Sequence, residues 1–224
     1  MAELTALYGP AHLAHQFDSL DQQKEASTLG MWLFLVTEIM FFGGLFCAYL
    51  IYRERATAGF AAASHELDIG LGTFNTAVLI ASSLTMAMGV RAAQLGRRKA
   101  LVGFLLATMA LGSVFLGVKV IEYGHKFHEH HVPGSSFYWE GAHPEAAEMF
   151  YSLYFAMTGL HALHMIAGIG VLVVIAVLAW KGHFGPGYYN PVECSGLYWH
   201  FVDIVWIFLF PLLYLIGRHV ATGG

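Results

Sequence analysis

Five long apolar stretches dominate the pattern of hydrophobic and polar positions along the chain. They cover residues 29–52, 71–94, 100–123, 149–180 and 193–217. Each reaches the roughly 20 mostly apolar residues with which an α-helix crosses a bilayer. None shows the alternation that marks a strand of a membrane β-barrel. The pattern predicts an all-α fold, a polytopic membrane bundle of five transmembrane helices. We expect one membrane domain over residues 1–224, with a polar N-terminal segment at 1–28.

The composition indicates lipid as the solvent. Hydrophobic residues make up 57% of the chain and charged residues only 12%, whereas roughly a quarter of the residues of a soluble domain are charged. The net charge of −4 is small and the few basic residues form no patch, so no nucleic-acid partner is expected. Cys47 and Cys194 lie in or beside apolar stretches and are interpreted as packing residues rather than a disulfide pair.

The basic residues predict the orientation of the chain. Five spans place the two termini on opposite sides of the membrane. Six basic residues fall on the N-terminal side and four on the other side: Lys24, Arg91, Arg97, Arg98, Lys99 and Lys181, against Arg53, Arg55, Lys126 and Arg218. Because cytoplasmic loops are enriched in Lys and Arg, the N-terminus is predicted to be cytoplasmic. The predicted loop at 124–148 then faces outward.

Glu38 is an ionisable residue inside the first apolar stretch, about 13 Å along the helix from Leu29. Such a residue in lipid needs a partner or a purpose, and no basic residue occurs within one helical turn of it. Two interpretations stay open. Glu38 is either a protonated carboxyl that hydrogen-bonds a neighbouring helix, or a group that takes part in proton transfer.

Lys119 and Glu122 stand three residues apart near the end of the third stretch. This spacing places them on one helix face, where their charges can pair. In the fifth stretch, Glu193, His200 and Asp203 follow one another at offsets of seven and three, which keeps them on one side of the helix. That stripe is interpreted as a structural hydrogen-bond network facing protein or lipid headgroups.

His161 and His164 are expected to share one face of the fourth stretch. Paired histidines in a membrane helix are typical of heme or metal ligation, although bis-histidine heme ligation needs partners at matched depth on two helices. His200 is the only other histidine clearly within a stretch. The default interpretation is hydrogen bonding within the bundle. The histidine-rich segment 125–131 is interpreted as a solvated loop rather than a metal site.

Several motifs occur in the order in which one family carries them. They are EIMFF at 38–42, Asn75-Thr76 followed by Ser82-Ser83, Glu122-Tyr123, TGLHALH at 158–164 and YWHFVDIVW at 198–206. The last string is highly specific, whereas the others are weak alone. In these motifs the chain resembles subunit III of the heme–copper terminal oxidases, known as cytochrome c oxidase subunit III, in a five-helix bacterial form.

The resemblance implies a non-catalytic subunit of a proton-pumping respiratory oxidase that reduces oxygen to water. Its partners would be oxidase subunits I and II, which carry the heme and copper, and structural phospholipids; this chain itself would hold no cofactor or metal. Electrons would come from cytochrome c or a quinol through the complex, in the bacterial plasma membrane. Glu38 matches the family's buried glutamate facing a lipid cleft, with a part in proton uptake. Glu193 and His200 match positions near bound lipid.

Compared with seven-helix members, the chain begins near the third helix, and the missing pair forms one wall of the lipid cleft. Three alternatives stay open beside a cytochrome c oxidase subunit. The chain could be subunit III of a quinol oxidase, an accessory protein of a nitric oxide reductase, or an independent b-type cytochrome that uses His161, His164 or His200.

Overall fold

The structure is a computed structural model that describes residues 13–134 and 136–215. Its long helices are α2 (Leu20–Arg55), α4 (Ile69–Gln94), α5 (Arg98–His128), α6 (Pro144–Lys181) and α7 (Asn190–Phe210). A short helix, α3 (Thr57–His65), follows α2, and a π-helical turn, η2 (Pro211–Leu215), extends α7. Within these described residues, five helices are long and apolar enough to cross a membrane, which confirms the predicted bundle. The end of the fifth predicted stretch, Arg218 and the first twelve residues lie outside the described residues.

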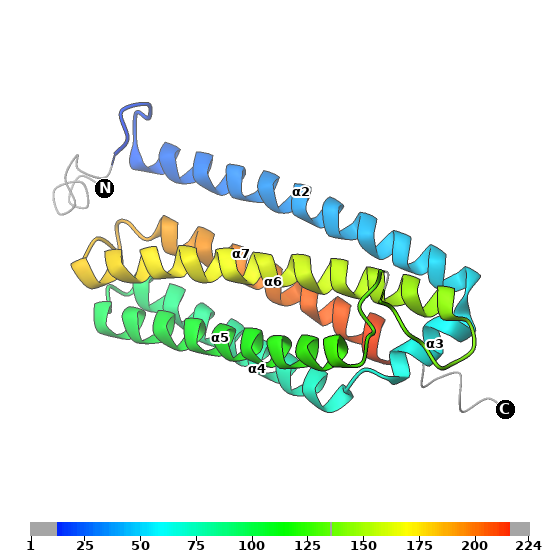
Figure 1. Cartoon of the computed structure of the whole chain (residues 1–224). Helices are drawn as coiled ribbons and strands as arrows, with labels where there is room; N and C mark the ends of the chain where they lie inside the picture. The colour runs from blue at the N-terminus through cyan, green and yellow to red at the C-terminus, as the bar shows by residue number, and fades with distance from the viewer. Residues whose placement is uncertain (1–12, 135, 216–224) are drawn as a thin grey trace.

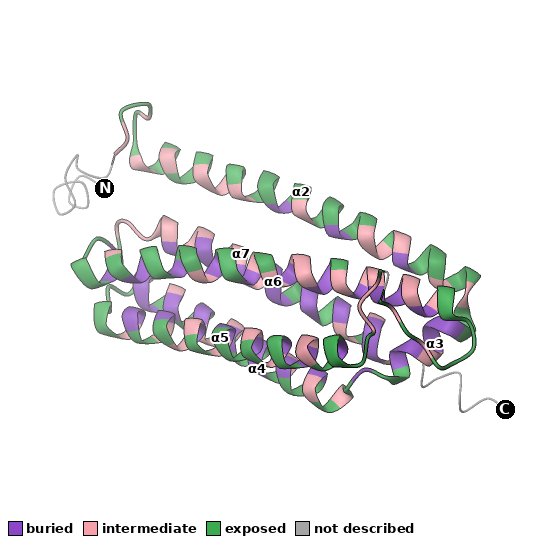
Figure 2. Ribbon diagram, in the orientation of Figure 1, coloured by how far each residue is buried: buried purple, intermediate pink, exposed green. Residues whose placement is uncertain are grey.

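Four of the long helices form a closed bundle in which α4, α5, α6 and α7 each pack on two neighbours. Helix α2 packs on the edge formed by α6 and α7. Figure 1 shows α2 along one edge of the bundle, slanting toward it at the end where α3 turns across. Near the start of α2, Lys24 donates a hydrogen bond to the Tyr189 hydroxyl at 3.1 Å, and near its middle Phe34 contacts Tyr198 of α7. In the most apolar part of α2 only 17% of the residues are buried, against 50% in the span Asn190–Leu215, which joins α7 and η2. Figure 2 shows α2 mostly in the colours of exposed and intermediate residues. Helix α2 therefore offers most of its surface to lipid or to another protein.

Aromatic side chains of α7 fill the centre of the bundle. Trp199 and Trp206 are almost completely buried. A side chain at Gly112 of α5 would meet the Trp199 ring at 2.8 Å, so the absence of one at this position lets α5 and α7 approach. The indole nitrogen of Trp199 donates to Ser82 Oγ of α4 at 3.1 Å. This hydrogen bond satisfies a polar group that would be costly to bury unpaired in lipid.

The helices extend beyond the predicted apolar stretches because their ends are polar and capped. Helix α2 begins at Leu20, where the Ser19 side chain accepts a hydrogen bond from the Gln22 amide. Helix α4 begins in the same way after Asp68. Pro144 stands at the start of α6, a position that its fixed φ favours. Apolar length therefore identified the spans, and the caps determine where the helices start.

The predicted loop at 124–148 is partly wrong, because α5 continues to His128 and α6 already begins at Pro144. Lys126 lies buried rather than solvated, and its Nζ donates to the Glu66 carbonyl at 2.9 Å and to Glu129 at 2.5 Å. His131 stacks on Tyr151 with ring centroids 5.0 Å apart. The interpretation of 125–131 as a solvated loop is wrong for these two residues, since tertiary contacts bury polar side chains that composition assigns to water. Helix α3 was not predicted.

Candidate functional site

Glu38 and His164 form the polar contact between α2 and α6. Glu38 Oε2 lies 3.1 Å from His164 Nε2, so the partner that the sequence required is on another helix. His164 Nδ1 lies 2.9 Å from the Leu160 carbonyl. A carbonyl only accepts hydrogen bonds, so Nδ1 carries a proton. The contact with Glu38 then holds one further proton, which resides on either the carboxyl or Nε2.

Aromatic rings surround this pair. Phe42 meets the His164 ring edge-on at 5.2 Å, and Tyr198 lies nearly parallel to it at 6.4 Å. The Tyr198 hydroxyl donates to the His164 carbonyl at 3.0 Å. The side chains of His164 and Glu38 remain 14% and 19% exposed. Packing therefore holds the pair in place, while part of each side chain remains accessible to a small molecule or lipid chain between the helices.

An apolar groove runs between α2 and α7 beside this pair. It has a volume of about 400 Å³ and is lined by aromatic and aliphatic side chains that include Trp32, Phe42, Phe46 and Phe208. His200 is its polar lining residue. A groove with such walls in a membrane protein can hold an acyl chain. Its second wall is the exposed helix α2.

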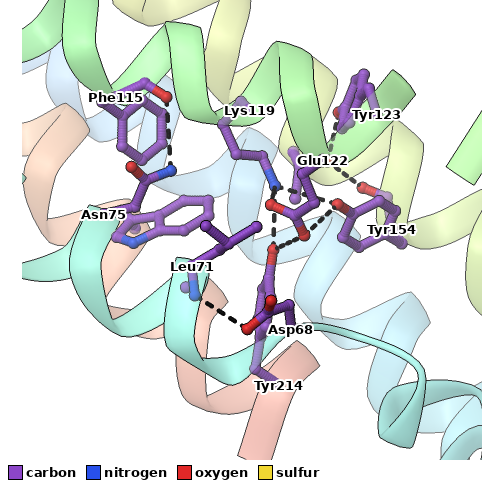
Figure 3. Close-up of polar contacts among 12 residues, drawn as sticks. Asp68, Leu71, Asn75, Phe115, Lys119, Glu122, Tyr123, Tyr154 and Tyr214 are labelled. Carbon is purple, nitrogen blue, oxygen red and sulfur yellow. Dashed lines mark hydrogen bonds and ion pairs between the residues drawn. The ribbon is translucent and has the colours of Figure 1, made fainter. Parts of the chain in front are cut away.

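Lys119 and Glu122 form the predicted ion pair, with Nζ and Oε2 2.9 Å apart. Figure 3 shows that two tyrosines complete the contact. Lys119 Nζ also donates to the hydroxyls of Tyr154 at 3.1 Å and Tyr214 at 3.0 Å. Both hydroxyls donate to Glu122 Oε1. All three ammonium protons and both carboxylate oxygens are used, so the buried charges are satisfied within the chain.

The two tyrosines were missed in the sequence because they come from distant parts of the chain. Tyr154 stands on α6 and Tyr214 on η2, 35 and 95 residues from Lys119. No spacing rule connects residues so far apart. The cluster ties α5 to α6 and to the end of α7, and it serves the packing of the bundle.

His161 and His164 do not face the same neighbours. The His161 ring is packed between Phe115 and Trp206, at 5.3 Å from each, and neither ring nitrogen has a hydrogen-bond partner within residues 13–134 and 136–215. His164 points to α2 instead. An offset of three residues keeps the two histidines on neighbouring parts of the helix surface, and the packing of the bundle gives each of them contacts with different helices.

The predicted stripe of Glu193, His200 and Asp203 is not one hydrogen-bond network. Among the described residues, His200 Nδ1 pairs with Ser83 Oγ of α4 at 2.8 Å, while both carboxylate oxygens of Asp203 and Glu193 Oε2 lack partners. Glu193 lies in the first turn of α7. Their spacing placed the three residues on one side of the helix, but in the packed bundle each of them has different contacts.

The described part of the chain contains no group of three His, Cys, Asp or Glu side chains arranged to hold a metal ion. His161, His164 and His200 each have different neighbours, so they do not converge on one space. Beside the Lys119–Glu122 cluster, polar groups also converge where Glu38 meets His164, and where Ser83, His200 and Asp203 line one pocket.

Comparison with known proteins gives a consistent result. The family model described as cytochrome c oxidase subunit III matches residues 18–218. A quinol oxidase subunit 3 of Bacillus spizizenii is 32% identical over 92% of this chain and 97% of its own length. A probable cytochrome c oxidase subunit 3 of Nocardia farcinica is 34% identical over 91% and 94%. The cytochrome c oxidase subunit 3 of Thermostichus vulcanus is 32% identical over 90% and 92%. The chain belongs to the cytochrome c oxidase subunit III family of the heme–copper terminal oxidases.

Proposed function

We propose that the chain is the non-catalytic subunit III of a proton-pumping respiratory oxidase that reduces oxygen to water. In this role it stabilises subunit I, supports proton uptake and binds structural phospholipid. Heme and copper belong to subunits I and II, and this chain holds neither. The family match over residues 18–218 and the names of the relatives support the assembly part of the proposal.

The Glu38–His164 pair carries the proton part of the proposal. It holds one proton between Oε2 and Nε2, 3.1 Å apart, and both side chains remain partly exposed. A pair of side chains that can take up and release a proton without a backbone movement is suited to storing a proton locally. Phe42 contacts His164 and also lines the α2–α7 groove. Lipid in that groove keeps the pair shielded from bulk water.

We place the N-terminus in the cytoplasm of a bacterial plasma membrane. The relatives named above are bacterial. The orientation is supported by Arg91 in the last turn of α4, Lys181 in the last turn of α6, and Arg98 and Lys99 at the start of α5. On the opposite side, Lys126 is buried and paired. It therefore adds little free positive charge there, which increases the bias.

Affinity purification through a tag on this chain in mild detergent tests the proposal. We expect mass spectrometry to find heme–copper subunits I and II and the purified complex to consume oxygen. Membranes from a strain with the untagged chain serve as the control. Recovery of the chain alone and carrying heme would mean that it is an independent cytochrome. Recovery with a nitric oxide reductase would make it an accessory protein of that enzyme.

A quinol oxidase is the second candidate because relatives with that name match at similar identity, 32% against 34%. The same preparation distinguishes the two. Oxygen consumption with reduced cytochrome c supports a cytochrome c oxidase, and consumption with a quinol alone supports the second candidate.

A further inference from the structure

Asp203 is a buried acidic residue that the proposed function does not use. It is 3% exposed, and neither of its carboxylate oxygens has a hydrogen-bond partner among the described residues. Ser83 lies close enough to influence it but outside hydrogen-bond geometry, and its hydroxyl pairs with His200. The carboxyl group therefore lacks a donor.

The position of Asp203 along α7 makes this lack costly. The span that contains it runs over Asn190–Leu215, so Asp203 lies at its middle. Ser83 lies near the middle of the neighbouring span, Ile69–Gln94. A carboxyl group at this depth cannot obtain hydrogen bonds from headgroups or bulk water. A donor must come from another molecule at the same depth.

A pocket of about 450 Å³ opens above Asp203 on the seam between α4 and α7. Ser83, His200 and Asp203 form its polar part, and its walls include Ile80, Leu84 and Ile204. These three wall residues are 51–62% exposed. The pocket therefore faces outward from the bundle, away from the interior of this chain.

The two outward hollows beside α7 differ in chemistry. The groove toward α2 is apolar apart from His200, whereas the pocket toward α4 gathers a hydroxyl, an imidazole and a carboxyl group. Acyl chains suit the first and donate nothing to the second. If water alone filled the pocket, its volume would hold on the order of ten molecules, most of them against aliphatic walls.

We propose that the α4–α7 seam is the surface on which a transmembrane helix of another oxidase subunit docks. That helix presents a hydrogen-bond donor, a hydroxyl, amide or indole N–H, to Asp203 near the bilayer midplane. The inference rests on the proposed function, which supplies a partner subunit. Polar side chains of this kind hold membrane helices together. The Asp203 side chain turns toward the donor on docking, a rotamer change that is common at interfaces.

Site-specific photo-crosslinking in the assembled complex tests this surface. A photoreactive residue replaces Ile80 or Leu84, which line this pocket and not the α2–α7 groove, in the tagged chain. Met40 of α2 and Val120 of α5, 72% and 71% exposed, are the matched lipid-facing controls. We expect adducts with one other subunit from Ile80 and Leu84, and lipid adducts from the controls. Lipid adducts alone from the pocket positions, or adducts with a second copy of this chain, would overturn the inference.

Two variants test the hydrogen bond itself. Asp203→Leu removes the acceptor at similar size, and we expect roughly tenfold less retention of this chain on the complex as detergent is raised. Asp203→Asn still accepts a hydrogen bond and should be retained like the wild type. Equal retention of all three chains contradicts the role of Asp203. Should Asp203→Leu misfold, the crosslinks of the wild-type background still decide the case.

Failure of the two proposals can be told apart. If the unmodified tagged chain recovers no heme–copper subunits, the proposed function fails and the inference falls with it. If those subunits are recovered but the pocket positions do not crosslink to them, the inference alone fails.

Discussion

Glu38 of α2 and His164 of α6, 126 residues apart in sequence, lie at hydrogen-bond distance, with Oε2 and Nε2 3.1 Å apart. The arrangement follows from the Leu160 carbonyl, which fixes a proton on the other ring nitrogen. Both residues are ionisable groups inside a membrane span, and each provides the other with a hydrogen-bond partner that lipid cannot supply. This relationship leads to the first prediction.

Glu38→Gln keeps a hydrogen bond to His164 but removes the exchangeable proton. We expect the heme spectrum and subunit content of the complex to be unchanged, while steady-state proton uptake falls or the enzyme inactivates in fewer turnovers. Stopped-flow measurements with a pH dye and progress curves of oxygen consumption check this. Glu25→Gln, at an exposed site before the apolar part of α2, is the control. Unchanged proton kinetics and lifetime would remove Glu38 from the mechanism.

Lys119→Met leaves the carboxylate of Glu122 buried without its cation. Breaking one side of a buried pair costs about 3–5 kcal/mol, so we expect a marked fall in the thermal unfolding temperature of the purified protein. The double variant Lys119→Met/Glu122→Leu removes both charges and should recover part of that loss. Lys99→Met changes an exposed lysine of the same helix and should have little effect. A double variant less stable than the single variant would contradict the pairing.

Gly112 and Gly117 of α5 give a matched pair for packing. A Cβ at Gly112 would approach the Trp199 ring to 2.8 Å, whereas one at Gly117 meets nothing within 4 Å. Gly112→Ala should destabilise the protein by about 1–3 kcal/mol through overpacking. Gly117→Ala should be neutral or stabilising, because alanine favours a helix. Thermal unfolding in detergent micelles checks both. Similar effects from the two variants would mean that Trp199 moves freely.

His131, outside the spans, makes stability depend on pH. Burial lowers its pKa below the ordinary value of 6.5, and the positive charge of Lys126 lowers it further, against the opposing charges of Glu129 and Glu66. The folded chain therefore prefers the neutral ring. That contribution to stability is present above pH 6.5 and is lost as the pH falls through the lowered pKa of the folded state. We expect the unfolding temperature to fall on acidification through this range.

Two variants assign this pH dependence to His131. His131→Phe keeps an aromatic ring against Tyr151, which stacks on the histidine at 5.0 Å, and should flatten the dependence of unfolding temperature on pH. His128→Phe, at an exposed position at the end of α5, should leave the dependence as in the wild type. An identical slope in all three chains would show that other groups are responsible.

The local sequence determined which segments cross the membrane. Apolar length and the scarcity of charge identify five spans, because the bilayer sets the length of a helix that crosses it. The ion pair of Lys119 and Glu122 could also be predicted, since an offset of three is a property of one helix. The motif order, above all YWHFVDIVW at 198–206, indicated the family that the comparisons confirmed.

Tertiary structure decided which polar groups meet. Glu38 finds His164 from α6, Lys119 finds Tyr214 from the end of α7, and His200 finds Ser83 from α4. Hydrophobic periodicity specifies only which face of a helix is apolar, and in lipid even that signal is weak because the surroundings are apolar too. The depth of Asp203 in its span follows from the sequence, whereas only the packed bundle shows that the described part of the chain provides its carboxyl group with no donor.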